Sequence, residues 1–174
     1  MERSVKAFLT YSWDSEKHLS WVESLAARLR RDGVNSILDR WHLKPGHDKY
    51  AFMEHSIGKA DYVLVVCTPS YARKADARIG GVGYEATVVT PELAGEINQL
   101  KFVPVLREGD WEESVPRWLK TRLGIDLRGE PYDERAYADL LRHIHAAHHE
   151  PPSIGPRPSF LVARHRPILP MHWE

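Results

Sequence analysis

The chain has 174 residues, a length that fits one domain with a buried core. Its 24 lysines and arginines balance 24 aspartates and glutamates, and this neutrality argues against a main role in nonspecific binding to nucleic acids or membrane surfaces. No apolar run approaches the roughly 20 residues of a membrane span, and a single cysteine excludes an internal disulfide, so we expect a cytoplasmic protein.

The first predicted elements are a short strand and an amphipathic helix. Residues 5–10, VKAFLT, are typical of a buried strand. Apolar residues then recur at helical spacing over residues 19–29, which predicts a helix that ends near residue 32. Three polar residues between the two elements are candidate helix caps: Ser12, Asp14 and Ser15.

A second strand, a polar loop and a third strand follow. Residues 34–39, VNSILD, predict a strand, and the polar segment after it is centred on a Pro45-Gly46 turn. A short helix is predicted at residues 49–57. Residues 61–68, DYVLVVCT, are continuously apolar over most of their length, which is typical of a parallel strand covered on both faces.

The loop after the third strand contains the stretch RIGGVGYE, with three glycines in four positions before Tyr84 and Glu85. Glycine suits a tight turn or the close approach of a ligand, and the lysine of a phosphate-binding loop is missing. We therefore interpret the stretch as a loop that presents a glutamate. The remaining predicted elements are a helix or helical turns at 84–97, strands at 101–106 and 124–128, and a helix at 133–148.

Strands that alternate with helices predict an α/β fold, with a doubly wound parallel sheet and right-handed crossovers. Ligands of such sheets bind beyond the carboxyl ends of the strands. The segments after the first three strands carry most of the polar, aromatic and glycine-rich residues, so we expect them to meet at one rim. Residues 1–150 are predicted to form this domain, and the proline-rich residues 151–174 to pack on it or lead to a partner domain.

Four segments, in this order and spacing, carry a family resemblance: AFLTYSWDSEKHLSWVESLAARLRRDGVNSILD, WHLKPGHDKYAFMEHSI, ADYVLVVCTPSYARKA and GGVGYE. Over about residues 5–144 the chain resembles a bacterial Toll/interleukin-1 receptor (TIR) domain, close to the SEFIR branch. The resemblance implies a flavodoxin-like sheet of five parallel strands. It also implies an assembly loop for contacts between TIR domains, formed by Lys44, Pro45, Gly46, His47 and Asp48.

The same resemblance implies an enzyme that cleaves NAD+ at the nicotinamide–ribose bond, with NAD+ as substrate and no cofactor. Such domains act as antiviral effectors in bacterial immunity and are activated by self-assembly. Glu85 matches the position of the family's essential glutamate. Cleavage builds positive charge on the ribose, which a nearby carboxylate stabilises. The product is ADP-ribose or a cyclic isomer of it.

The candidate substrate-binding residues lie in the rim segments: Ser12, Trp13, Asp39, Trp41, Arg78 and Tyr84. Each has a structural alternative, since the tryptophans could cover the sheet edge and Asp39 could cap the following loop. Arg78 could be solvated, and Glu85 could be a surface acid at a helix start. Several NAD-cleaving relatives carry an aromatic residue four positions before the glutamate, where this chain has Gly81.

A rival hypothesis is a non-catalytic module that only scaffolds TIR–TIR contacts. Gly81, in place of the aromatic residue of NAD-cleaving relatives, favours this scaffold, whereas the glycines before Glu85 favour the enzyme. A third hypothesis, a flavodoxin-like nucleotide binder, ranks last because the sequence has no phosphate-binding loop. No metal site is expected, although His145 and His149 have ligand-compatible spacing. The expected partners are NAD+, further copies through the loop after the second strand, and a sensor domain or partner protein. Direct binding to nucleic acid or membrane is not expected.

Overall fold

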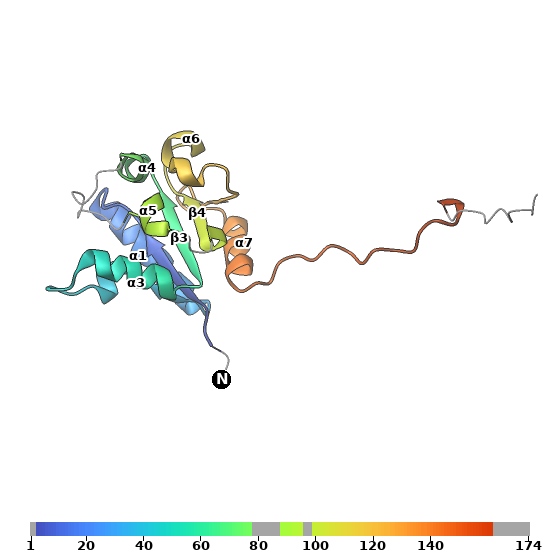
Figure 1. Cartoon of the computed structure of the whole chain (residues 1–174), viewed down its shortest axis with the longest axis horizontal. Coiled ribbons are helices and arrows are strands. Elements are labelled where there is room, and N and C mark those ends of the chain that lie inside the picture. The colour runs from blue at the N-terminus through green and yellow to red at the C-terminus, as the bar shows by residue number, and fades with distance from the viewer. Residues whose placement is uncertain (1–2, 78–87, 96–98, 162–174) are drawn as a thin grey trace, which may run out of the picture.

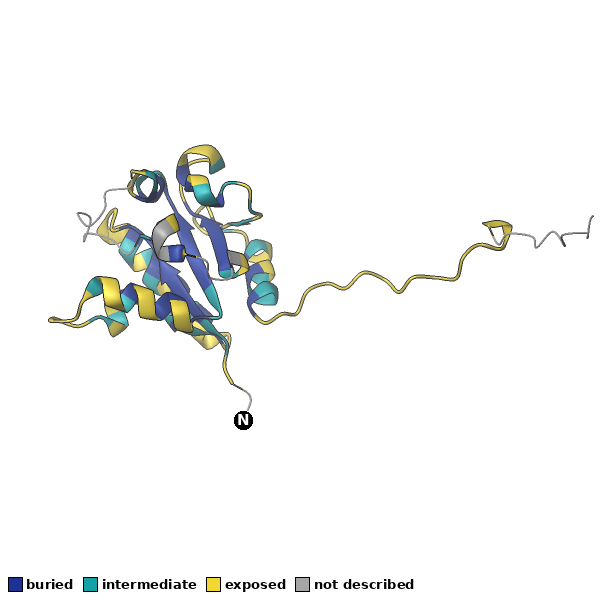
Figure 2. Ribbon diagram, in the orientation of Figure 1, coloured by how far each residue is buried: buried dark blue, intermediate teal, exposed yellow. Residues whose placement is uncertain are grey.

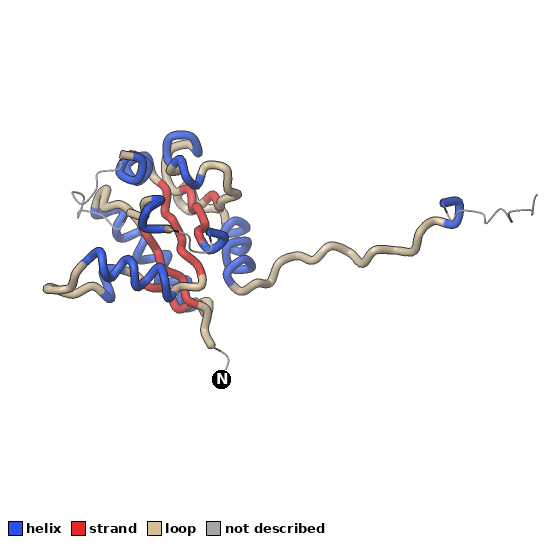
Figure 3. Tube along the Cα trace, viewed as in Figure 1, coloured by secondary structure: helices blue, strands red, loops and turns tan. Residues whose placement is uncertain are grey.

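The computed structural model describes residues 3–77, 88–95 and 99–161. Within them, five parallel strands form one sheet in the order β2-β1-β3-β4-β5 (Figure 3). The strands are β1 (Lys6–Thr10), β2 (Asn35–Ile37), β3 (Tyr62–Cys67), β4 (Phe102–Leu106) and β5 (Ile125–Asp126). The predicted α/β class and the flavodoxin-like five-stranded parallel sheet are thereby confirmed.

Helices cover both faces of the sheet (Figure 1). They are α1 (Glu16–Arg31), α2 (Asp39–His42), α3 (Lys49–Lys59), α4 (Pro69–Asp76), α5 (Pro91–Ala94), α6 (Trp111–Ser114) and α7 (Glu134–Ile144), with short 3₁₀ turns at Gln99–Lys101, Arg117–Leu119 and Ser159–Leu161. Apolar side chains of α1 and α7 pack on one face, and those of α3 and α4 pack on the other. This arrangement is the doubly wound one.

Strand β3 supplies both cores, which explains its unbroken apolar sequence. Leu64 and Val66 join the core under α1 and α7, while Val63, Val65 and Cys67 join the core under α3 and α4. All five are fully buried, as the dark ribbon at the centre of Figure 2 shows. Successive side chains of a strand point to opposite faces, so a strand covered on both faces must be apolar throughout.

Helix α1 follows the capping signals of the sequence. Of the three candidate caps, Ser15 takes the position, because its Oγ accepts a hydrogen bond from the backbone N–H of His18 at 3.1 Å. The helix ends at Arg31, and Gly33 then adopts φ +88°, a conformation that glycine accommodates without strain.

Two helices occupy segments that the sequence analysis treats as loops, and those two expectations were wrong. Helix α4 begins at Pro69, and Thr68 caps it by accepting a hydrogen bond from the backbone N–H of Tyr71 at 3.2 Å. Proline suits the first turn of a helix, where its missing N–H leaves no bond unmade. Helix α2 is a single turn that begins at Asp39, directly after the second strand. In both segments polarity suggested a loop; the cap at Thr68 accounts for α4, whereas α2 has no side-chain cap.

Of the helix or helical turns predicted at residues 84–97, the structure describes residues 88–95, where the only helical turn is α5. One other predicted helix is shorter than expected. The last helix ends at Ile144 rather than near residue 148, since Ala146 adopts φ +53° and breaks the helical path.

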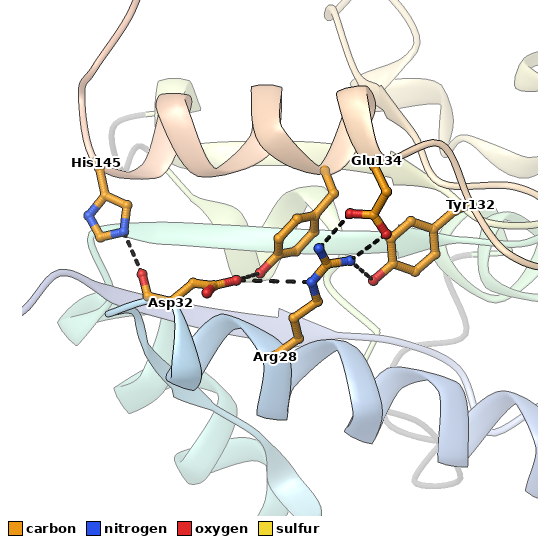
Figure 4. A network of polar contacts seen from close by, with 6 residues as sticks. Arg28, Asp32, Tyr132, Glu134 and His145 are labelled. Carbon is orange, nitrogen blue, oxygen red and sulfur yellow. Dashed lines mark hydrogen bonds and ion pairs between the residues drawn. The ribbon is translucent and has the colours of Figure 1, made fainter.

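A polar network ties α7 to the carboxyl-terminal half of α1 (Figure 4). The guanidinium of Arg28 donates to both carboxylate oxygens of Glu134, at 3.0 and 2.5 Å, and to the hydroxyl of Tyr132 at 3.1 Å. One turn along, the hydroxyl of Tyr137 donates to the carboxylate of Asp32 at 2.7 Å. These bonds fix α7 beside α1 on the same face of the sheet.

The described part of the predicted tail, residues 151–161, is exposed along its length and extends away from the domain (Figures 1 and 2). Among the described helices, none has the length and apolar character needed to cross a membrane.

Candidate functional site

The carboxyl ends of β1, β2 and β3 form one rim of the sheet, as expected for parallel strands. The chain crosses from β1 to β2 in one direction, then returns past β1 to place β3 and β4 on the other side. The point between β1 and β3 is therefore the switch point at which open α/β sheets bind ligands. Ser12 and Trp13 follow β1, Asp39 follows β2, and Thr68 follows β3.

Asp39 is a buried carboxylate at this rim, with 2% of its surface exposed. Its Oδ1 accepts a hydrogen bond from the hydroxyl of Tyr11 at 2.5 Å and one from the backbone N–H of Arg40 at 2.8 Å. Its Oδ2 accepts a bond from the indole N–H of Trp13 at 3.3 Å. Burial and the bond to Asp39 raise the pKa of Tyr11 far above its usual range, so Tyr11 remains a neutral donor.

Trp13 is held by Asp39 but remains 40% exposed. The ammonium group of Lys49, in the first turn of α3, lies 4.7 Å from the centroid of its ring. The indole thus connects the loop after β1 with the start of α2 and the start of α3. It presents a partly open aromatic surface at the rim of the sheet, and its role in substrate binding stays a prediction.

Trp41 packs against α1. Its indole N–H donates to Glu23 at 3.2 Å, and the guanidinium of Arg30 lies 5.4 Å from its ring centroid. Both partners belong to α1, and Trp41 joins the edge of the core beneath that helix. These contacts favour the alternative of a structural role for Trp41 over contact with a ligand.

Asp14 is a rim residue that the sequence analysis considered only as a helix cap. Its Oδ1 accepts a hydrogen bond from the hydroxyl of Ser12, and its Oδ2 accepts one from the hydroxyl of Thr68 at 2.7 Å. The two hydroxyl oxygens lie 3.3 Å apart and are fully buried, whereas Asp14 is exposed. The carboxylate therefore bridges the ends of β1 and β3 at the switch point.

Tyr71 of α4 anchors the chain that follows the glycine-rich stretch. Its hydroxyl accepts a hydrogen bond from the backbone N–H of Val89 at 2.9 Å and lies 2.9 Å from the hydroxyl of Thr10. Tyr71 is fully buried, and burial raises the pKa of its phenol well above the usual range. A neutral phenol in this position attaches Val89 to the carboxyl end of β1.

Three predicted site residues lie outside the described residues: Arg78, Tyr84 and Glu85. The three glycines before Tyr84 lie there as well. Their proposed roles stay predictions.

The predicted assembly loop connects α2 to α3 and projects from the body of the domain (Figure 1). The backbone N–H of His47 donates to the carbonyl of Lys44 at 3.0 Å, and Gly46 adopts φ +88° within this turn. Asp48 ends the loop and caps α3, because its carboxylate accepts from the backbone N–H of Ala51 at 2.9 Å. The loop is exposed and carries a Pro-Gly turn, as predicted.

His18 lies near the N-terminus of α1 and lines a small hollow of about 180 Å³ together with Arg107. Only 3% of His18 is exposed, and its ring lies parallel to that of Trp21, with 6.5 Å between the centroids. Among the described residues, neither ring nitrogen of His18 has a hydrogen-bond partner. Burial lowers the pKa of His18, so the folded protein favours the neutral imidazole.

The described residues contain no cluster of three or more histidine, cysteine or acidic side chains that could hold a metal ion. One of the two spaced histidines, His145, uses its Nε2 in a hydrogen bond with the backbone carbonyl of Asp32 at 3.0 Å (Figure 4). Cys67 is buried in β3, and burial raises the pKa of its thiol to about 12, which disfavours the nucleophilic thiolate.

A flavodoxin-like parallel sheet with polar and aromatic residues at the carboxyl ends of its strands defines a doubly wound α/β domain. The family model described as "TIR domain" matches residues 8–141. The chain belongs to the TIR domain family and is of the bacterial SEFIR type.

Solved structures agree with this assignment. A prokaryotic SEFIR domain is 43% identical, with a TM-score of 0.71, over 81% of this chain and 99% of that one. The TIR domain of the Toll-related receptor TRR-2 from Hydra magnipapillata is 15% identical, with a TM-score of 0.51, over 83% of this chain and 99% of that one, which shows a common fold. A search of curated proteins returned no match.

Proposed function

We propose that this TIR domain cleaves the nicotinamide–ribose bond of NAD+, with Glu85 as the catalytic carboxylate. The observation that carries the proposal is the partly exposed indole of Trp13, which Asp39 fixes at the rim of a TIR sheet. An exposed aromatic residue held by a buried carboxylate suits a site for a planar ring. Membership of the TIR family supplies the reaction class.

The chemistry requires little from the protein beyond placement and charge. As the bond to nicotinamide breaks, positive charge develops on the ribose, and a carboxylate beside the sugar stabilises that state. Nicotinamide leaves as a neutral molecule, since it was cationic in the substrate. Water or a second part of the ADP-ribose then captures the sugar, which gives linear or cyclic product.

We further propose that activity depends on self-assembly through residues 44–48 and that the protein acts as an anti-phage effector. The exposed position of this loop on the domain supports its availability to a second copy. A sensor domain or partner protein is the expected trigger.

A second candidate is a TIR scaffold without catalysis. The similarity to a SEFIR domain favours it, together with Gly81 in the position where NAD-cleaving relatives carry an aromatic residue. In this function the loop at residues 44–48 carries the activity and the rim residues stabilise the fold.

The two functions are separated by measuring NAD+ consumption and nicotinamide release by the purified chain at high concentration, with and without a crowding agent. Glu85→Ala is the test variant, and Glu150→Ala, at an exposed glutamate after the last helix, is the matched control. We expect nicotinamide release by the wild type and the control and none by Glu85→Ala. If the chain oligomerises and leaves NAD+ intact, the scaffold function replaces the enzyme.

A further inference from the structure

We propose that Asp14 is a ligand-binding residue that accepts hydrogen bonds from the two vicinal hydroxyls of a ribose. This role deepens the proposed function. It rests on that function only for the identity of the ligand, a ribonucleotide of the NAD+ class. It adds a further carboxylate to the two that the sequence predicts for the site, Glu85 and Asp39.

Asp14 does not serve as the N-cap of α1. Ser15 caps α1, through its bond to the backbone N–H of His18. Among the described residues, no lysine or arginine forms an ion pair with Asp14. Its side-chain partners among the described residues are instead two buried hydroxyls, those of Ser12 and Thr68.

Those hydroxyls fix the carboxylate in place. Ser12 lies two residues after the buried end of β1. Thr68 is the N-cap of α4 and accepts a hydrogen bond from the backbone N–H of Tyr71 at 3.2 Å. The backbone N–H of Asp14 also donates to the carbonyl of Ser12 at 3.0 Å. An exposed aspartate anchored by the core at both oxygens is pre-organised, so a ligand that binds it does not have to order the side chain.

Asp14 has the capacity to bind such a ligand. A carboxylate offers about four lone-pair positions, and the hydroxyls of Ser12 and Thr68 use one on each oxygen. Among the described residues, no further hydrogen bond uses the second position on either oxygen, and Asp14 is exposed. Two acceptors on one carboxylate match two adjacent hydroxyl donors, in the same way that acidic residues bind ribose hydroxyls at other α/β switch points.

The charge of Asp14 restricts which part of a nucleotide can lie against it. A phosphate would be repelled by the carboxylate, whereas hydroxyl donors form charge-assisted hydrogen bonds with it. Trp13, the adjacent residue, offers a partly exposed aromatic surface for a neighbouring ring. Sugar hydroxyls at Asp14 and a ring near Trp13 would follow the order of groups in a nucleoside.

The test measures the binding of ADP-ribose, which the proposed reaction does not consume, by calorimetry. Wild type and Asp14→Asn are each titrated with ADP-ribose and with an analogue that lacks the 2-hydroxyl of its terminal ribose. Glu16→Gln, an exposed acid two residues away, is the matched control, and Ser12→Ala removes one anchor of the carboxylate while keeping its charge. Thermal unfolding verifies that each variant is folded.

We expect Asp14→Asn to weaken ADP-ribose binding by about 10-fold to 100-fold, as for loss of a hydrogen bond to a charged group. The deoxy analogue should bind the wild type more weakly by a similar factor, and Asp14→Asn should remove most of that difference. Ser12→Ala should give an intermediate loss, and Glu16→Gln none.

Equal affinity of wild type and Asp14→Asn for ADP-ribose overturns the inference, and so does a wild type that does not bind ADP-ribose. Failure of the proposed reaction has a different signature. In that case nicotinamide release is absent although ADP-ribose binds in an Asp14-dependent way, which leaves a ribonucleotide-binding TIR domain without hydrolysis.

Discussion

At the scale of single residues, the site is built around a buried charge. Asp39 loses most of its hydration on folding, a cost that three hydrogen bonds offset. The shortest of them comes from Tyr11, which is itself fully buried. Removing that donor leaves the carboxylate without one of its side-chain partners.

We therefore predict that Tyr11→Phe lowers the free energy of unfolding by about 1.5–3 kcal/mol, the usual range for a bond to a charged group. Urea denaturation monitored by circular dichroism provides the measurement. Tyr50→Phe is the control because Tyr50 is 58% exposed, and its effect should stay within about 0.5 kcal/mol. Equal effects of the two substitutions would contradict the role of Asp39 as a buried, hydrogen-bonded charge.

His18 predicts a dependence of stability on pH. Burial lowers its pKa in the folded state, Arg107 acts in the same direction, and Asp14 and Glu108 act against both. Below the ordinary histidine pKa of about 6.5, the unfolded chain binds a proton that the folded chain resists. The contribution of the neutral His18 side chain to the free energy of unfolding is therefore complete above pH 6.5 and is lost as the pH falls below that value.

Between pH 7.5 and 5.5, we expect the wild type to lose more unfolding free energy than His18→Phe does, by up to about 1.4 kcal/mol for each pH unit below 6.5. Urea denaturation at both pH values gives the difference. His55→Gln, at an exposed histidine of α3, should keep the wild-type slope. A His18→Phe variant with that same slope would show that the pKa of His18 is not lowered in the folded protein.

At the scale of elements, apolar strands were easier to predict than helices. The run at residues 61–68 contains β3, because a strand buried on both faces leaves few polar positions. Helices α2 and α4 were not predicted, since they are short and lie in polar segments. The Thr68-Pro69 pair was the available signal, because threonine caps a helix whose first residue can be proline.

Residues of the candidate site were likewise predictable only where the sequence itself places them at the end of a strand. Trp13 and Asp39 were proposed because Trp13 lies just after the first predicted strand and Asp39 ends the second, and strand ends determine the rim. Asp14 was missed because its partner Thr68 is 54 residues away, and only the adjacency of β1 and β3 brings them together. The side-chain orientation of Trp41 could not be predicted, because a loop has no regular spacing that assigns its residues to one face.

The N-cap of α1, Ser15, can be tested by substitution. Ser15→Ala should lower the free energy of unfolding by about 1 kcal/mol, since it removes the acceptor for the backbone N–H of His18. Ser20→Ala, at an exposed position inside the same helix, should cause no loss because alanine is the better helix former. Chemical denaturation of both variants measures the difference. A similar small effect at both positions would indicate that Ser15 does not cap the helix.

At the scale of the whole molecule, the sheet and its two cores lie within residues 6–144. Residues 151–161 are exposed and extend away from them. A chain that ends at Glu150 should therefore fold and keep its unfolding free energy within about 0.5 kcal/mol. Thermal and urea denaturation of the shortened chain provide the measurement. A clear loss of stability would mean that residues 151–174 contribute to the packed domain.

The two outer strands of the sheet have a consequence for how copies of the domain can join. β2 has three residues and β5 has two, so each border of the sheet offers few unpaired backbone groups to an incoming strand. Continuous strand addition from one molecule to the next would gain few hydrogen bonds there. Filaments of this protein are thus expected to grow through side-chain contacts between loops and helices, and to lack the 4.7–4.8 Å cross-β repeat in fibre diffraction.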